Sequence, residues 1–405
     1  MRNTIIGIAI FFLSFSTAAW EPMGPPGGKL DELAVAISNE DIIYVNPYYP
    51  LACIYKSVDA GVAWSRINVG INFSSLVVDP TNPDIVYAGG GYGNAYKSIN
   101  GGLNWTRYSI SGSISALLVH PILNTMVFAV GQVSAGAKNV AAFFKSTNGG
   151  VTWSTVNLDT ASGLANCLTL DNNNPNIIYV GGYSWSPLPL PRVYKSTNGG
   201  TSFLSTSVGL IAGDQVYSIA AHPTDDNFVY AATGECIYRS TDGGIFWTQT
   251  FANAIASLST TPVLPDHVYA GGDTCVYKST DAGATWAVSG TGLYGKGIRG
   301  LFASRNQATK FYATNGAGFF KTTNGGLNWF ASNSGINSAD IGTFAISRSA
   351  PSTIYVEFKD VGIYKTTDGG SSWTKLPDFL SCGNICALCI HNTDANTLFA
   401  LEGAG

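Results

Sequence analysis

The stretch YRSTDGGIFW, residues 238–247, places a hydroxyl and a carboxylate on a glycine-rich segment between two aromatic residues. Ser240 and Asp242 are of the types that serve as nucleophile and as acid or base in hydrolases. The same residue types also accept hydrogen bonds from backbone N–H groups in tight turns. The two interpretations differ in what they predict elsewhere in the chain, because catalysis needs one such site whereas a turn can recur.

The pattern occurs eight times, at intervals of 39 to 50 residues. The position of Asp242 holds Asp in four copies and Asn in the other four, namely Asp59, Asn100, Asn148, Asn198, Asp242, Asp281, Asn324 and Asp368. An amide cannot act as a catalytic acid or base, but its oxygen accepts hydrogen bonds as a carboxylate oxygen does. The position therefore needs an acceptor, and we interpret these residues as structural.

The segments around each copy predict strands. Residues before and after the Asn/Asp-Gly-Gly turn read as strands, and the glycines tolerate the positive φ angles of a hairpin. Upstream of every copy, a short apolar run ends in an aromatic residue, from Tyr44 in the first unit to Tyr355 in the eighth. Eight residues before most of these aromatics is a polar position that ends a further strand, occupied by Asp79, His120, Asp171, His222, Thr261, Ser304 and Ser347. Each unit thus contains four antiparallel strands, A to D, and their repetition is typical of a β-propeller.

The motif Ser/Thr-x-Asp/Asn-x-Gly-x-x-Trp resembles the Asp-box, or BNR, repeat of sialidases, sortilin-type receptors, xyloglucan-cleaving glycosidases and photosystem II assembly factors. The resemblance covers nearly the whole mature chain. It implies an all-β fold, a β-propeller of four-stranded antiparallel blades, with about eight full blades and partial blades at both ends. In that family the Asp boxes lie on the face away from the binding centre. Because its members have different activities, the resemblance does not identify the function.

The two ends of the chain differ from the repeats. Residues 1–19 resemble a secretory signal peptide, because Arg2 precedes an apolar core and small residues. We therefore expect a secreted, periplasmic or cell-surface protein without a membrane span, whose Asp-box propeller occupies residues 20–405. Trp20 reads as a lone D strand, and residues 386–405 read as the A–B pair of a ninth unit. A continuation beyond Gly405 would either close a large ring or begin a second propeller.

Composition excludes some partners. Only 11% of the residues are charged, the net charge is −4, and no basic patch is present, so nucleic acid is not expected as a partner. The seven cysteines, an odd number, predict no regular disulfide framework. Cys382, Cys386, Cys389 and His391 are of metal-binding types, but Cys386 and Cys389 would face opposite sides of a strand. We expect no metal or cofactor there, and a local disulfide or unpaired thiols instead.

Enzymatic activity is not favoured by the residues. A sialidase, by family resemblance, needs three arginines, a Tyr–Glu pair and an acidic Asp, whereas only Arg192 and Arg299 lie where a central pocket would use them. The segment IIYVNPYY at 42–49 does not resemble the strand that carries the catalytic Asp of xyloglucanases. We assign no catalytic residue. If the protein is a glycoside hydrolase, Glu235 and Asp273, on B–C loops of neighbouring units, are the best carboxylate pair.

The binding face follows from the strand order. The A–B and C–D turns of a blade share one face of a propeller, and the B–C and D–A loops share the other. Because the Asp boxes are C–D turns, we expect a ligand on the opposite face. Two B–C loops there are long, Gln132–Ala142 in the third unit and Tyr183–Arg192 in the fourth, and the second contains three prolines that would stiffen it.

These considerations predict a ligand site on the face opposite the Asp boxes. Its principal residues and its further candidates are Tyr183, Trp185 and Arg192, and Tyr48, Tyr49 and Tyr294. Such side chains suit stacking on a sugar or gripping a partner chain; the alternative for Trp185 is packing over the rim. The sequence therefore predicts a secreted, non-catalytic propeller that binds a glycan or a protein. A glycoside hydrolase and an assembly factor or sorting receptor are the alternative functions.

Overall fold

The structure is a computed structural model. It describes residues 27–28, 30–47, 52–90, 93–185, 190–211, 215–293, 297–333, 337–338, 341–347, 350, 352–358, 362–376, 385–390 and 394–402. The predicted signal peptide, the predicted lone D strand and several candidate site residues lie outside these residues, namely Trp20, Tyr48, Tyr49, Tyr294, Cys382 and His391. The described regular structure is entirely β, as predicted.

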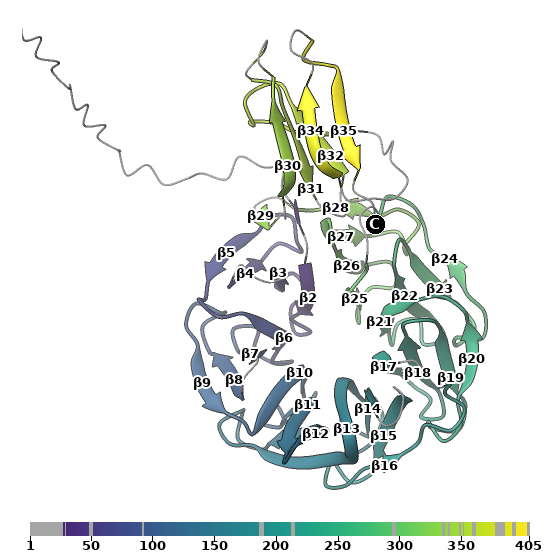
Figure 1. Ribbon diagram of the computed structural model, residues 1–405. Helices are drawn as coiled ribbons and strands as arrows, with labels where there is room; N and C mark the ends of the chain where they lie inside the picture. Colours follow the sequence, from purple (N-terminus) through teal and green to yellow (C-terminus); the bar gives the residue numbers. More distant parts are fainter. Residues whose placement is uncertain are drawn as a thin grey trace, which may run out of the picture.

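Seven blades form a ring in which strand A of each blade faces the centre and strand D the outside (Figure 1). Blades 1 and 2 contain β2 (Leu30–Val35), β3 (Ile43–Pro47), β4 (Cys53–Ser57), β5 (Ser65–Asn68), β6 (Phe73–Val78), β7 (Val86–Gly90), β8 (Asn94–Ser98) and β9 (Thr106–Ser109). Blades 3 and 4 contain β10 (Gly112–Val119), β11 (Val127–Ala135), β12 (Lys138–Ser146), β13 (Ser154–Leu170), β14 (Ile178–Ser184), β15 (Leu190–Ser196) and β16 (Leu204–Ser205).

The remaining ring strands repeat the same order. Blade 5 contains β17 (Val216–Ala221), β18 (Val229–Thr233), β19 (Ile237–Ser240) and β20 (Thr248–Phe251). Blade 6 contains β21 (Ile255–Thr260), β22 (Val268–Gly272), β23 (Val276–Ser279) and β24 (Ala287–Val288). Blade 7 contains β25 (Gly300–Ala303), β26 (Phe311–Asn315), β27 (Gly318–Thr322) and β28 (Phe330–Ala331).

One strand belongs to two blades. β13 is 17 residues long; its first part pairs with β12 of blade 3 and its second part pairs with β14 of blade 4. Strands D and A, which the sequence repeat predicts to be separate, are therefore continuous at this junction. Blades 3 and 4 consequently form one seven-stranded sheet.

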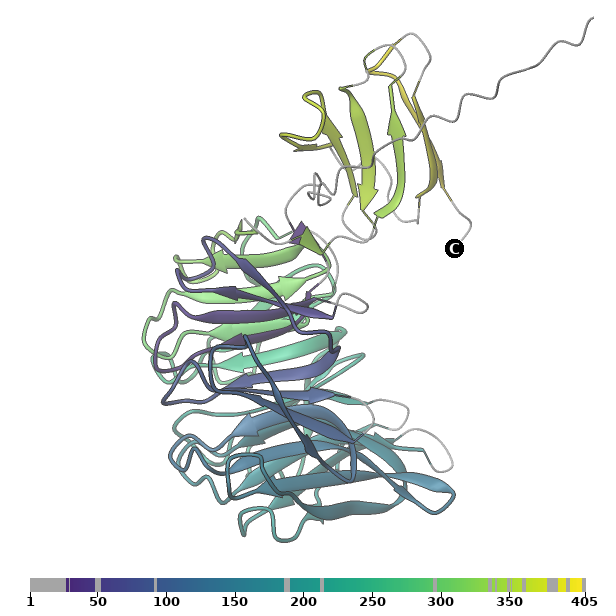
Figure 2. The same cartoon turned by 90° about the vertical axis from the view of Figure 1, so that its left-hand side faces the viewer.

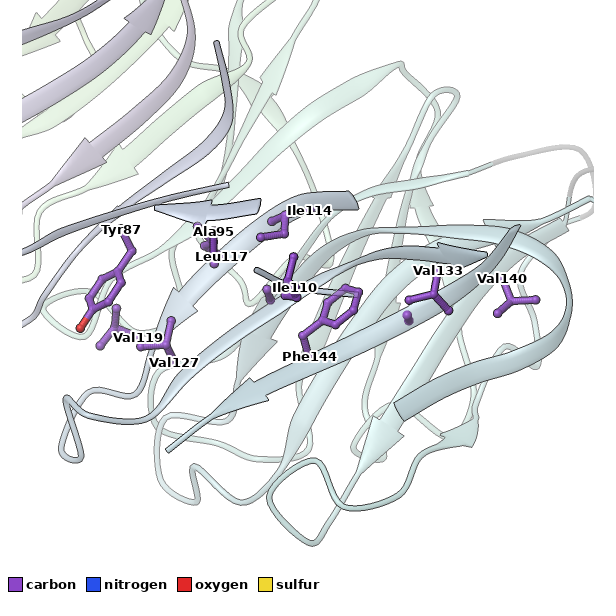
Figure 3. Close-up of a cluster of buried hydrophobic side chains, with 12 residues drawn as sticks. Tyr87, Ala95, Ile110, Ile114, Leu117, Val119, Val127, Val133, Val140 and Phe144 are labelled. Atoms are coloured by element: carbon purple, nitrogen blue, oxygen red, sulfur yellow. The ribbon is translucent and has the colours of Figure 1, made fainter. Parts of the chain in front are cut away.

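The cores lie between neighbouring blades. The strand-B aromatics are buried in every ring blade, and in the junction of blades 2 and 3 Tyr87 packs in one cluster with Val119, Val127 and Phe144 (Figure 3). Strand D, by contrast, is mostly exposed, as in β5 and β9. Because each blade buries its apolar surface against the next, the ring is a series of small cores, and burial of this surface stabilises it.

The Asp-box side chains act as hydrogen-bond acceptors. In all eight boxes one side-chain oxygen accepts a hydrogen bond from the Ser or Thr hydroxyl two residues earlier, at 2.7–3.0 Å. The same oxygen accepts the N–H four residues later, at 2.9–3.0 Å. Asp and Asn boxes share this geometry. Where the residue is Asp, the donors favour the charged form: the Thr285 hydroxyl, with backbone and Ser279 donors, lowers the pKa of Asp281 to about 2.

The polar position at the end of strand A has a comparable role in the A–B turn. Oδ1 of Asp79 accepts the N–H groups of Thr81 and Asn82, at 2.8 and 3.1 Å. In blade 3 the acceptor is Nδ1 of His120, which receives the N–H groups two and three residues later, at 3.2 and 3.0 Å. Asp, His and Ser thus serve the same turn, because each offers one acceptor at the same place.

The ring closes through a contact that also joins consecutive blades. The Tyr44 hydroxyl of blade 1 donates to the carbonyl of Pro83 in blade 2, at 3.0 Å. At the equivalent positions, the Tyr312 hydroxyl of blade 7 donates to the carbonyl of Glu40 in blade 1, at 3.4 Å. Blade 7 therefore contacts blade 1 as blade 1 contacts blade 2.

A second repeated contact supports this closure. Nε1 of Trp247 in blade 5 donates to the carbonyl of Thr206 in blade 4, at 2.7 Å. Nε1 of Trp64 in blade 1 donates to the carbonyl of Ser332, directly after blade 7, at 2.8 Å. In addition, the ring of Trp64 packs edge-on against Phe319 of blade 7, with centroids 4.9 Å apart.

The eighth four-stranded blade stands outside the closed ring (Figures 1 and 2). It contains β30 (Ile341–Ile346), β31 (Ile354–Phe358), β32 (Gly362–Thr366) and β33 (Thr374–Lys375), and β34 (Ile385–Ile390) and β35 (Leu398–Glu402) form a further two-stranded sheet. β1 (Gly27–Gly28) pairs in parallel with β29 (Asn337–Ser338), in the segment that joins ring and eighth blade. The eight complete sequence repeats thus correspond to seven ring blades and one separate blade, and the A–B pair of the ninth repeat corresponds to the two-stranded sheet.

The described cysteines form no disulfide bond. These cysteines are Cys53, Cys167, Cys236, Cys275 and Cys389. Burial raises the pKa of the Cys167 thiol to about 12, so it is held in the neutral form. Within the described part of the chain, no helix has the length and apolar character needed to cross a bilayer.

Candidate ligand-binding face

A cleft of about 510 Å³ opens on the face opposite the Asp boxes, between the inner strands of blades 1, 5, 6 and 7. Its lining residues are Glu32, Tyr217, Gly234, Ala254, Ile255, Ala256, Gly272, Asp273, Gly297 and Arg299. They come from the first half of A strands, from the end of β22 at Gly272, and from B–C and D–A loops. We call this site the central cleft.

A β-bulge near the start of strand A places residues at the rim of the central cleft. In six of the seven ring blades, one residue of strand A has no partner in strand B; these residues are Asp31, Ser74, Ser115, Asn166, Tyr217 and Ala256. Each lies thirteen residues before the strand-B aromatic of its blade, and Arg299 has the same position in blade 7. Tyr217, Ala256 and Arg299 all line the cleft. Bulges re-aim side chains in this way next to binding sites.

The polar groups of the cleft include both charge signs. Glu32 and Asp273 supply carboxylates, and Arg299 supplies a guanidinium. Backbone hydrogen bonds position two of them, because the Gly297 N–H donates to the carbonyl of Asp273 at 2.6 Å and the Arg299 N–H donates to that of Thr314 at 3.1 Å. The cleft can therefore offer both donors and acceptors to a polar ligand.

The predicted aromatic site lies beside the central cleft. Tyr183, at the end of β14, is buried, whereas Trp185 is 56% exposed and meets the Tyr183 ring edge-on with centroids 5.1 Å apart. Burial raises the pKa of Tyr183; a hydrogen bond with the Trp185 side chain opposes this rise, and the phenol of Tyr217 adds to it. Tyr217 lies on β17, which packs against β14, and it also lines the cleft. Tyr183 and Trp185 therefore lie beside the part of the cleft that Tyr217 lines.

Arg192 is engaged by neighbouring strands. Its Nε donates to Oγ of Ser184 at 3.2 Å and lies 3.8 Å from Oδ2 of Asp159. The same Asp159 oxygen accepts the Tyr194 hydroxyl at 3.1 Å. In the structure, therefore, Arg192 links β15 to β14 and β13, and less of its hydrogen-bonding capacity is open to a ligand than the sequence suggests.

The expected loop at Tyr183–Arg192 is shorter than predicted, because both of its ends belong to the paired strands β14 and β15. The expected loop at Gln132–Ala142 is wrong. These residues extend β11 and β12 into a longer hairpin, paired from Gln132–Ala141 to Ala135–Lys138, with Gly136 at a φ of 70° in the turn. Both this hairpin and β14 pair with β13, so the extensions of blades 3 and 4 are neighbours, as their order in the sequence indicates.

The carboxylate pair considered for a hydrolase is only half present in the cleft. Asp273 lines it, whereas Glu235 is exposed and does not belong to its lining; the second carboxylate there is Glu32. Among the described residues, no group of three or more His, Cys, Asp or Glu side chains is arranged to hold a metal ion. Sequence reasoning missed Glu32 and Tyr217, although the position of Tyr217 relative to the strand-B aromatic is a signal that could have identified it.

Comparison with known proteins supports the fold. By sequence, the chain matches no protein-family profile and no curated protein. By structure, it is similar to the GH74 xyloglucanase from Xanthomonas campestris, with 14% identity and a TM-score of 0.66 over 92% of this chain and 71% of that one. An ancestral GH74 enzyme is 18% identical, with a TM-score of 0.68 over 96% of this chain and 60% of its own length. This chain thus spans about three fifths of the length of that enzyme.

A smaller protein has the same architecture. YCF48, in a structure bound to a D1 peptide, is 14% identical, with a TM-score of 0.53 over 75% of this chain and 97% of that one. YCF48 from Cyanidioschyzon merolae gives a TM-score of 0.51 at the same identity. At these identities the likeness shows the fold alone. The predicted resemblance to BNR/Asp-box β-propellers and the predicted all-β propeller are confirmed.

Proposed function

We propose that this protein is a non-catalytic binding propeller that takes a glycan on the face opposite the Asp boxes. The ligand would cross the central cleft and stack on Trp185. The observation that supports this proposal is the position of the aromatic residues: Tyr217 lines the cleft, and its strand packs against β14, where the Tyr183 ring contacts Trp185 edge-on. This combination favours a sugar ligand. An exposed aromatic ring stacks on the apolar C–H groups of a sugar, and carboxylate, guanidinium and backbone groups form hydrogen bonds with the sugar hydroxyls.

A glycan array with the purified full chain tests the proposal. We expect Trp185→Ala and Tyr217→Ala to weaken binding of the best glycan by about tenfold or more, as truncation of a central aromatic contact does. Phe246→Ala is the matched control, because Phe246 is 52% exposed but lies in an Asp box on the other face. Equal affinity of wild type and Trp185→Ala, or equal loss in Phe246→Ala, would show that this face is not the glycan site.

A glycoside hydrolase is the second candidate, because Glu32 and Asp273 line one cleft and such enzymes act through two carboxyl groups. The similarity to GH74 enzymes concerns the fold, and the xyloglucanase activity belongs to the relative. We expect no release of sugar from xyloglucan or sialosides. Turnover that survives purification and disappears in both Glu32→Gln and Asp273→Asn would replace the binding function by catalysis.

A protein ligand is the third candidate, because one similar propeller, YCF48, has been solved with a bound D1 peptide. A binding experiment with wild type and Trp185→Ala distinguishes a protein ligand from a glycan. A partner captured by wild type, lost in Trp185→Ala and resistant to glycosidase treatment would be a protein bound at this face.

We also propose that the chain is exported and cleaved before Trp20. The support is the sequence of residues 1–19, with Arg2 and an apolar core. N-terminal sequencing of protein from the periplasm or culture medium should begin at Trp20. Full-length protein retained inside the cell would contradict export.

A further inference from the structure

A second cleft, of about 190 Å³, lies at the opposite ends of the inner strands, on the Asp-box face. It is formed by the last residues of strands β13, β17, β21 and β25 and by the turns that follow them. The residues that matter for its chemistry are Thr169, Asn172, Ser259, Thr260, Phe302 and Arg305. Because it is on the other face, this cleft is independent of the proposed glycan site.

Arg305 is the only charged residue among the described residues that line this cleft. The Glu40 carboxylate of blade 1 is 7% exposed and lies close enough to act on the charge of Arg305, but its hydrogen-bond donors are other groups. Its two oxygens accept the Ser304 hydroxyl at 2.7 Å, the Arg305 N–H at 2.9 Å and the Asn306 amide at 3.4 Å. These bonds use the backbone of Arg305 and the side chains of its neighbours. The guanidinium, with its five N–H donors, therefore retains capacity for a ligand.

Two further donors line the cleft. Nδ2 of Asn172 gives one hydrogen bond to the carbonyl of His222, at 3.3 Å, and has a second N–H. Oγ of Ser259 accepts the Ala303 N–H at 2.9 Å, which leaves its own hydrogen to donate. Thr260, by contrast, already donates to the carbonyl of Ala221 at 3.0 Å. A guanidinium, an amide and a hydroxyl around a small cleft are the donor set that recognises an oxyanion.

We propose that this second cleft binds a sulfate or phosphate group through Arg305, Asn172 and Ser259. The group is either a free inorganic anion or the charged end of a larger ligand. Phe302 forms an apolar wall beside it, which a carbon skeleton attached to the anion can contact.

Calorimetric titration of the full chain at constant ionic strength tests the site, with inorganic sulfate and inorganic phosphate as probes and chloride as the balancing anion. We expect saturable binding of one anion per chain. Arg305→Gln should weaken it by about tenfold or more, since hydrogen bonds to charged groups are the strong ones, and Arg305→Lys should retain part of the affinity. Glucose 6-sulfate, titrated in parallel, binds more tightly than inorganic sulfate if the anion belongs to a larger ligand.

Arg107→Gln is the matched control, because Arg107 is exposed on the outer strand β9 and its replacement removes the same charge. Sulfate also stabilises proteins by exclusion from their surfaces, so a rise in melting temperature alone is not evidence of binding. If Arg305→Gln fails to fold, the Nε–H resonance of Arg305 in wild type should still shift and saturate with added sulfate. Heats that do not saturate, or equal binding in Arg305→Gln and Arg107→Gln, would overturn the site.

Discussion

Asp242 accepts hydrogen bonds from the Ser240 hydroxyl and from the N–H groups of Ile245 and Phe246, at 2.7, 3.0 and 3.0 Å. Asn198 accepts the equivalent set in its own box. We therefore expect Asp242→Asn to leave the free energy of unfolding nearly unchanged. Asp242→Ala should lower it by about 1 kcal/mol, because water replaces the acceptor at this exposed turn. Urea unfolding of both variants measures the difference, and an Asn variant as unstable as the Ala variant would mean that the charge is needed.

At the scale of the turn element, His120 should make stability depend on pH. Its Nδ1 accepts two turn N–H groups, which requires the neutral ring. Burial, and next the Lys145 ammonium, lower the pKa of His120 below its usual value of about 6.5. The unfolded chain therefore binds a proton at a higher pH than the folded chain does. The contribution of His120 is complete above about pH 6.5 and is lost as the pH falls below it.

The replacement His120→Asn separates this effect from other titrations, because an amide oxygen accepts the same N–H groups without titrating. Between pH 8 and pH 5, the melting temperature of the variant should fall less than that of wild type. His267 also has a pKa lowered by burial and still titrates in the variant, so the difference between the two curves is the quantity to compare. If the melting temperatures of wild type and variant fall equally with pH, His120 has no role in the pH dependence of stability.

Strands and turns could be predicted because their causes are local. The repeated aromatic, the polar end of strand A and the Gly-Gly turn each fix a structure within a few residues. The Gln132–Ala142 hairpin was missed because its strand alternation is weak, although Gly136 marks the turn. The candidate site could be predicted only in part. Trp185 could be identified by its residue type. Tyr217 could not, because a β-bulge sets its position and the alternation of apolar and polar residues does not reveal the bulge.

The number of blades in the ring could not be predicted, for a different physical reason. Each blade has side chains that contact the following blade. The same side chains can contact either the next blade in the chain or, where the ring closes, the first blade. Tyr312 uses the carbonyl of Glu40 as Tyr44 uses that of Pro83. The ring size depends on the angle between blades, which accumulates over all the junctions and belongs to no single residue.

At the scale of the whole molecule, the Glu40 carboxylate should matter more for stability than other acids of the same turns, because it joins the first blade to the last. We expect Glu40→Ala to lower the free energy of unfolding by about 2–3 kcal/mol, since buried donors on Ser304 and Arg305 lose a charged acceptor. Equilibrium unfolding in urea, followed by tryptophan fluorescence, measures the loss.

Asp84→Ala is the control for this variant. Asp84 lies in the same turn of blade 2, but it is largely exposed and pairs with Lys56 at 3.4 Å. Its replacement should cost at most about 1 kcal/mol, as for other surface ion pairs. Equal losses in the two variants would mean that the closing junction depends on Glu40 no more than an ordinary surface contact does.

The junction of blades 7 and 1 repeats the tyrosine contact of blades 1 and 2 and the tryptophan contact of blades 4 and 5, so the ring has no structurally distinct first blade. Its blades are equivalent under rotation, as positions around a circle are, apart from their individual loops and single contacts such as those of the Glu40 carboxylate. A gene rearranged so that the ring begins at blade 2, with blade 1 joined behind blade 7 by a short linker, should still encode the same ring. The junction between blades 3 and 4 is the exception, because a break there would cut through the continuous strand β13.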